Sequence, residues 1–147
     1  MILISQQSPK WNFKTIGNSK TTIGAMGCTI CGLSMLSDYF GGYKDPAWMS
    51  KNLQFMYDKV IWKSIDKVLN FNFVWRGYKY DEKVILDALK DPKKACLLEI
   101  RKAHWVVGIK KVPLLGYWVA DPWPIGGSRH FYPVSYISGF STFKMKL

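Results

Sequence analysis

Cysteine, histidine and acidic residues are scarce in this chain. Three cysteines are too few for a disulfide framework, and two histidines supply a structural zinc site poorly, so we expect neither a metal nor a cofactor. Ten acidic residues stand against 21 lysines and arginines, which gives a net charge of +11. Such a field favours polyanions, whether nucleic acid, an acidic membrane or an anionic bacterial cell wall, without choosing among them.

Long apolar runs, internal repeats and low-complexity linkers are also missing. No run approaches the roughly 20 apolar residues of a membrane-spanning helix, and the first residues lack the basic and apolar regions of a signal peptide. We therefore expect one domain over residues 1–147, made in the cytoplasm and, if it leaves the cell, released by lysis or carried in a phage particle. Nearly half of the residues are hydrophobic, enough for a sizeable core.

Helical patterns come first in the chain and extended patterns follow. After a loop-rich segment over residues 1–26, apolar spacing predicts helices, and then β-propensity and short apolar runs predict strands. Asp45 and Asp81 are expected N-caps, with Pro46 in the first helical turn. This order favours an α+β domain in which helices pack on an antiparallel sheet. The expected helices are 28–40, 46–53, 59–69 and 81–89, and the expected strands are 72–78, 95–100, 104–109, 116–120, 129–132 and 140–146.

Cys28 stands at the start of the first expected helix, directly after Gly27. Unpaired N–H groups and the positive end of the helix dipole favour the thiolate, which is the nucleophilic form of cysteine. We expect Gly27 to permit a sharp turn and keep the sulfur accessible. A buried cysteine that acts as a small hydrophobic residue is the alternative for Cys28 taken alone.

A nucleophilic cysteine needs a base, and only His104 and His130 are available. His104 opens an apolar strand and is the better choice, because His130 lies in a glycine-rich region. Asp121 ends the next strand along the chain, so antiparallel pairing would bring its carboxylate to the imidazole. The Asp121-Pro122 sequence is also a common turn opener, and one aspartate can serve both purposes.

A side-chain amide near the nucleophile would complete an oxyanion hole together with a backbone N–H. Gln6 and Gln7 are the candidates, and their adjacency leaves the choice between them open. Cys31, three residues after Cys28, shares a helix face with it and is either a resolving thiol or a core residue.

Four segments in order carry a resemblance to a known family: Gln6 ahead of Trp11, Gly27-Cys28 opening a helix, His104 opening an apolar strand, and Asp121-Pro122 after the next strand. The order resembles that of the cysteine peptidases of family thirty-nine and their relatives, which include bacteriocin-processing peptidases and bacterial and phage proteins. The resemblance spans most of the chain. Ser8, where such sequences often have an aspartate, and Cys31 are departures from it.

The resemblance implies a papain-like fold and hydrolysis of peptide or amide bonds through a thioester. It implies Cys28 as nucleophile, His104 as general base, Asp121 as the orienting acid and Gln6 as oxyanion donor, with Gln7 as the alternative donor. The expected substrates are peptides, including the peptides of bacterial peptidoglycan, and a phage origin fits the group.

Three other functions compete with this expectation. A papain-like domain that has lost catalysis would serve as a binding or structural module, such as a virion component or an inhibitor of a host protein. A redox pair formed by Cys28 and Cys31 should follow a strand in a βαβ unit, whereas here a glycine-rich loop precedes it. Nucleic acid is not the expected partner, since the basic residues and aromatics form no known recognition motif.

Overall fold

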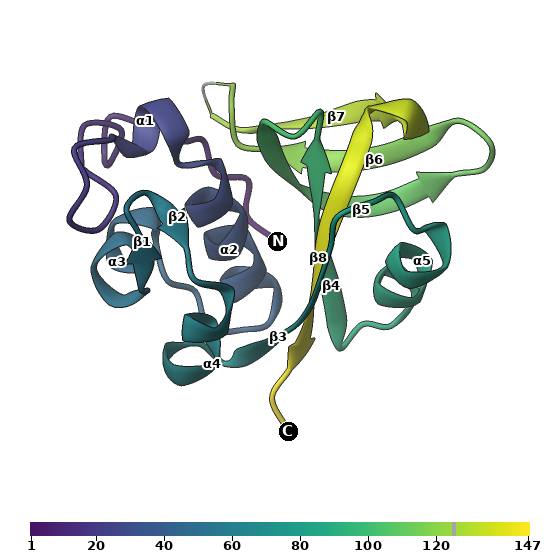
Figure 1. Ribbon diagram of the computed structural model, residues 1–147, viewed down its shortest axis with the longest axis horizontal. Helices are drawn as coiled ribbons and strands as arrows, with labels where there is room; N and C mark the ends of the chain where they lie inside the picture. Colours follow the sequence, from purple (N-terminus) through teal and green to yellow (C-terminus); the bar gives the residue numbers. More distant parts are fainter. Residues whose placement is uncertain (125) are drawn as a thin grey trace.

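The computed structural model describes residues 1–124 and 126–147, and it divides into a helical half followed by a large antiparallel sheet. Figure 1 shows the first four helices gathered on one side and most of the sheet, with α5, on the other. The fold is thus α+β, as the order of helical and extended patterns predicts. The helices are α1 (Ile23–Met26), α2 (Cys28–Tyr39), α3 (Pro46–Asn52), α4 (Ile65–Val68) and α5 (Glu82–Lys90), with 3-10 turns η1 (Trp62–Ser64) and η2 (Val134–Tyr136).

Helix α2 is the member of the helical half that packs on strand β5 (His104–Val112) of the sheet, and it is buried along most of its length. Its apolar residues are spread around the whole helix, as is typical of a helix surrounded by protein. Gly32 lets it approach the sheet closely, because a Cβ there would lie 2.8 Å from Leu97 Cδ2. The helix that begins with Cys28 is therefore anchored over its length by core packing.

The two predicted aspartate caps are confirmed. The Asp45 carboxylate accepts a hydrogen bond from the Trp48 N–H at 2.7 Å, and Pro46 occupies the first turn of α3. Asp81 accepts from the Val84 N–H at 3.3 Å at the start of α5. Each cap satisfies an N–H group that has no partner inside its helix.

The predicted helix over residues 59–69 is wrong in its first half. Strands β1 (Phe55–Met56) and β2 (Lys59–Val60) form a small hairpin there, and only η1 and the four residues of α4 are helical. Ser64 explains part of the difference, because its hydroxyl donates to the Ile61 carbonyl and accepts from the Gln54 N–H. Such side-chain bonds compete with the helical backbone pattern.

The sheet has six strands, and every pair of neighbours is antiparallel, as predicted. The order is β3-β8-β4-β5-β6-β7. The strands are β3 (Phe71–Gly77), β4 (Lys94–Ile100), β5 (His104–Val112), β6 (Gly116–Asp121), β7 (Ser128–Pro133) and β8 (Ile137–Met145).

The sheet separates two apolar cores. Leu97 and Val107 face the core shared with α2 and α3, whereas their neighbours Leu98 and Val106 face the core covered by α5. This alternation follows from the two-residue period of a strand. Both faces of the central strands are covered, so the backbone at the start of β5 and the end of β6 is firmly held.

The topology brings the start of β5 and the end of β6 together. Val107 pairs with Ala120, so His104 and Asp121 lie at the same end of this pair of strands. The N-terminal segment reaches the same end, because the Gln6 N–H donates to the Pro122 carbonyl at 2.7 Å. In the part of the chain that the structure describes, no helix has the length and apolar character needed to cross a bilayer.

Candidate active site

A pocket of about 330 Å³ lies where α2, β5, β6 and the N-terminal segment meet. All four residues selected from the sequence line it: Cys28, His104, Asp121 and Gln6. Gln7 does not. The remaining lining residues are Ala25, Met26, Ala103, Trp123 and Tyr132.

Cys28 is the first residue of α2 and is largely buried, with its side chain on the pocket wall. Gly27 adopts φ −85°, an ordinary value, so no unusual turn demands a glycine there. The demand is for space, because a Cβ on Gly27 would meet the Ile23 carbonyl and lie 2.6 Å from Ile23 Cγ2. The expected reason for this glycine was therefore wrong. Gly27 lets α1 and α2 pack end to end, which sets the position of Cys28.

His104 is held by Asp121 through a short hydrogen bond, with Nε2 2.7 Å from Oδ1. Burial of the half-buried ring lowers its pKa, but the hydrogen bonds to Asp121 and Cys28 and the charges of both outweigh burial and raise the pKa to about 9. A pKa of about 9 favours the imidazolium form of His104 at neutral pH. This charge would stabilise a Cys28 thiolate.

Asp121 accepts three hydrogen bonds and is almost fully buried. Oδ1 accepts from His104 and from the Trp123 N–H at 2.9 Å, and Oδ2 accepts from the Tyr132 hydroxyl at 2.7 Å. Burial raises the pKa of this carboxyl, but the three donors together lower it below its usual value. The bond to Trp123 closes the turn predicted for Asp121-Pro122, so the residue serves both of the purposes expected of it.

Tyr132, on β7, is a member of the site that the sequence does not reveal. Its hydroxyl is half-buried against Asp121, and burial together with the carboxylate raises the pKa of the phenol. Tyrosines are common in this chain, and nothing in the local sequence marks this one. The pairing of β7 with β6 is the signal that could have found it, because it places Tyr132 beside the strand that ends in Asp121.

Replacing Tyr132 by phenylalanine would leave Oδ2 of Asp121 without its donor. We expect the pKa of Asp121 to rise and that of His104 to fall, with kcat reduced by about tenfold because the imidazole is held less firmly. KM should change little. Steady-state kinetics over pH 5–9 would measure the effect, with Tyr136→Phe as the control because the Tyr136 ring packs at a tilt against Tyr132 and forms no hydrogen bond with Asp121 among the described residues. Equal effects of the two variants would contradict this role.

Gln6 and Gln7 both donate their side-chain Nε2 to the Gly24 carbonyl, at 3.1 and 2.7 Å. Only Gln6 is buried at the pocket, and one Nε2–H remains unused by that bond. Its Oε1 has no hydrogen-bond partner within residues 1–124 and 126–147. The geometry therefore favours Gln6 over Gln7 as a donor to a bound group.

The other thiols and the second histidine lie outside the pocket. Cys31 is fully buried, and burial together with the neighbouring Cys28 raises its pKa. Burial raises the pKa of Cys96 to about 12. His130 is exposed on β7 and packs on Tyr132. Within the described residues, no group of three or more His, Cys, Asp or Glu side chains is arranged to hold a metal ion.

No protein-family model matches this chain, and no curated protein matches it in sequence.

The raised pKa of His104 predicts a pH dependence of stability. The ordinary pKa is 6.5 and the value in the fold is about 9, so the folded protein binds this proton more tightly than the unfolded chain does. The resulting stabilisation, about 1–2 kcal/mol after solvent screening, is present in full below the unfolded pKa and is lost as pH rises through the folded one. Urea unfolding at pH 6 and pH 10 should show this loss in the wild type and not in His104→Ala. An equal pH dependence in both would contradict the assignment.

Proposed function

We propose that this protein is a papain-like cysteine hydrolase that cleaves a peptide or amide bond through a thioester on Cys28. The observation that carries the proposal is the convergence of Cys28, His104 and Asp121 on one pocket, with His104 bonded to Asp121 at 2.7 Å. The order of these same residues along the chain resembles that of the family-thirty-nine peptidases, and this resemblance supports the proposal.

In the first half of the reaction, the Cys28 sulfur attacks the carbonyl carbon of the substrate. The bond from Nε2 to Asp121 leaves Nδ1 of His104 as the nitrogen that exchanges a proton with the thiol. The imidazolium gives this proton to the leaving nitrogen as the carbon–nitrogen bond breaks. The acyl group remains on sulfur as a thioester, and the amine product departs.

In the second half, neutral His104 takes a proton from water as the water oxygen attacks the thioester carbonyl. The carbon–sulfur bond then breaks, the acid product leaves, and the thiolate–imidazolium pair is restored. In both halves the negative oxygen would lie near the backbone N–H of Cys28 and the unused Nε2–H of Gln6. The buried position of Gln6, fixed by its backbone bond to Pro122, supports this role.

Charge and pocket shape support peptides as the substrate class. The pocket is small and open, and it is flanked by the exposed side chains of Met26 and Trp123, which suits a short peptide segment. A net charge of +11 would concentrate the protein on an anionic bacterial wall, so peptidoglycan peptides are the first substrates to test. Release by lysis or carriage in a phage particle would bring the enzyme to that substrate.

The proposal is tested by measuring new amino groups after incubation with purified bacterial sacculi and with a mixed peptide library. Wild-type protein should release amines and, after acid quenching, carry an acyl adduct on Cys28 detectable by mass spectrometry. Cys28→Ser should do neither. No amine and no adduct from any substrate would instead favour the silent binding module.

A further inference from the structure

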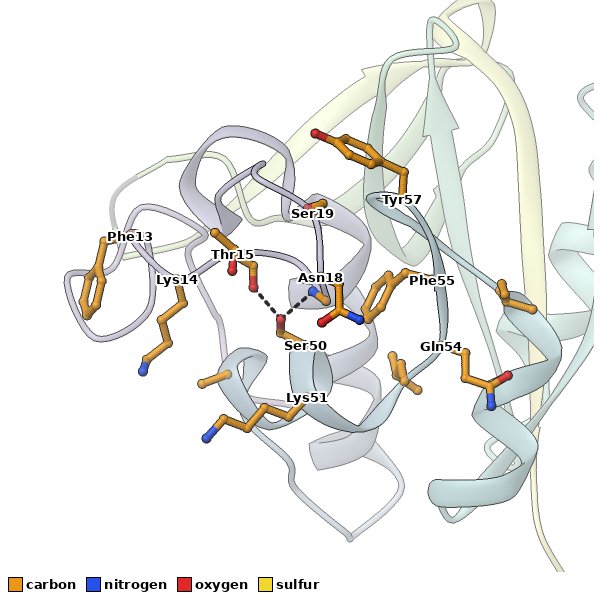
Figure 2. A pocket seen from close by; sticks show the side chains of 14 residues that line it. Phe13, Lys14, Thr15, Asn18, Ser19, Ser50, Lys51, Gln54, Phe55 and Tyr57 are labelled. Carbon is orange, nitrogen blue, oxygen red and sulfur yellow. Dashed lines mark hydrogen bonds between the residues drawn. The ribbon is translucent and has the colours of Figure 1, made fainter.

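A groove of about 1070 Å³ lies in the helical half. It lies between the loop of residues 13–19 on one side and α3 with the β1–β2 hairpin on the other (Figure 2). It shares no residue with the pocket around Cys28. The proposed hydrolysis therefore leaves this groove without a role.

The floor of the groove is firmly built. The buried hydroxyl of Ser50 donates to the Thr15 carbonyl at 2.6 Å and accepts from the Gly17 N–H at 3.0 Å, as the dashed lines in Figure 2 show. Gly17 has φ +54°, and a Cβ there would lie 2.8 Å from Phe55 Cδ2, so the Phe55 ring rests on the loop backbone. A floor held this way keeps its shape before a ligand arrives.

The groove carries uncompensated positive charge. Lys14 and Lys51 line it, and neither has a carboxylate within ion-pair distance among the described residues, whereas Lys94 is paired with Asp87 at 2.8 Å. Lys14 comes from the loop of residues 13–19 and Lys51 from α3, so each wall of the groove contributes one lysine (Figure 2). Its lining includes no acidic residue. A ligand with spaced negative charges complements this surface.

The other exposed groups in the groove suit hydroxyl groups and sugar rings. The side-chain amides of Asn18 and Gln54 form no hydrogen bond within the described chain, and each offers both donors and an acceptor, as a sugar hydroxyl does. The rings of Phe13 and Tyr57 are 67% and 63% exposed. The Lys14 ammonium lies over one face of the Phe13 ring, 5.4 Å from its centroid. The other face of Phe13 and the ring of Tyr57 can stack on the C–H faces of pyranose rings.

Tyr57 also has a strained backbone. Its φ of +56° lies in the left-handed region, at the turn of the β1–β2 hairpin, where glycine would be the ordinary choice. Arg101, Lys102 and Leu114 adopt the same conformation elsewhere in the chain, so the backbone alone does not mark Tyr57 as functional. The turn places its ring at the rim of the groove.

We propose that this groove binds an acidic polysaccharide, with its carboxylates at Lys14 and Lys51 and its sugar rings against Phe13 and Tyr57. Nucleic acid fits less well, because its dense phosphates call for many cations and this groove supplies two lysines and no arginine. The amides of Asn18 and Gln54 would bond to the sugar hydroxyls. The site would hold the protein on a carbohydrate surface independently of any catalysis at Cys28.

The test is fluorescence anisotropy with labelled oligogalacturonate, a neutral galactose oligomer of equal length, and a thymidine oligonucleotide. We expect oligogalacturonate to bind at least about tenfold more tightly than either other probe. Lys14→Ala/Lys51→Ala should weaken its binding by about tenfold or more, and the charge-matched control Lys83→Ala/Lys110→Ala by no more than about threefold. Thermal unfolding would confirm that all variants fold.

Tyr57→Ala should weaken binding of oligogalacturonate as well, because it removes a stacking ring and no charge, whereas the Phe13 ring also contacts Lys14. Cys28→Ser should bind like the wild type, so failure of the proposed hydrolysis would leave this result unchanged. Tighter binding of the oligonucleotide would overturn the proposal in favour of nucleic acid. Equal losses in the two double-lysine variants would overturn it in favour of diffuse surface charge.

Discussion

Replacing Cys28 by serine is expected to abolish amine release from wall peptides, with kcat falling by about 10⁴-fold or more because a hydroxyl is far less acidic than a thiol and does not ionise beside the His104 imidazolium. The fold should persist, since the two side chains are similar in size and Cys28 lies at the pocket wall. The measurement is the rate of amine release under saturating substrate, together with the thermal unfolding temperature.

Cys31→Ala is the matched control for this variant. Cys31 is three residues along the same helix and fully buried, so it cannot reach a substrate. Its loss should cost about 1 kcal/mol of stability through a small cavity and leave the rate within a few-fold of the wild type. If Cys31→Ala were the inactive variant and Cys28→Ser the active one, the proposed nucleophile would be wrong.

Replacing Asp121 by alanine should have the second largest effect. Three donors lose their acceptor at once: His104 Nε2, the Trp123 N–H and the Tyr132 hydroxyl. We expect kcat to fall by about 10²–10³-fold because the imidazole is neither oriented nor stabilised in its charged form. The free energy of unfolding should fall by about 1–3 kcal/mol because buried donors are left unpaired.

Asp121→Asn separates orientation from charge. The asparagine oxygen can still accept from His104, as it does in cysteine–histidine–asparagine sites, but the carboxylate charge that helps to raise the pKa of His104 is gone. The activity of Asp121→Asn should therefore lie between those of the wild type and Asp121→Ala. His104 should lose its proton at a lower pH in this variant than in the wild type. Identical rates for the asparagine and alanine variants would show that charge alone matters, and a wild-type rate for Asp121→Ala would remove Asp121 from the site.

Local signals in the sequence predicted most of the elements. Asp45 and Asp81 mark helix starts because a cap acts on its own first turn. The predicted helix over residues 59–69 failed because Lys59 and Val60 pair with Phe55 and Met56 across a turn, and apolar spacing over so short a segment does not separate a hairpin from a helix.

The candidate site was predictable only in part, for a similar reason. Cys28 and His104 each begin an element, and Asp121 ends one. Because consecutive antiparallel strands place the start of one beside the end of the next, the sequence could predict that the side chains of His104 and Asp121 lie close together. The choice of Gln6 over Gln7 depends on which of the two side chains is buried, and both lie in a segment with little regular structure. The hydrogen bond from Tyr132 to Asp121 depends on β6 and β7 being neighbours in the sheet. Gly27 was selected correctly for a wrong reason, because its contact with Ile23 exists only once α1 and α2 have packed.

The most direct test of a reactive Cys28 is its alkylation rate with iodoacetamide between pH 5 and pH 9, followed by mass spectrometry at each cysteine. With an imidazolium at His104 beside the sulfur, Cys28 should react at pH 6 at least about tenfold faster than glutathione, and Asp121→Ala should slow it. Cys31 and Cys96 should remain unmodified because both are 0% exposed and lie outside the pocket, whereas Cys28 is 8% exposed on the pocket wall. A Cys28 that reacts no faster than glutathione at pH 6, with a rate unchanged in Asp121→Ala, would contradict its assignment as the nucleophile.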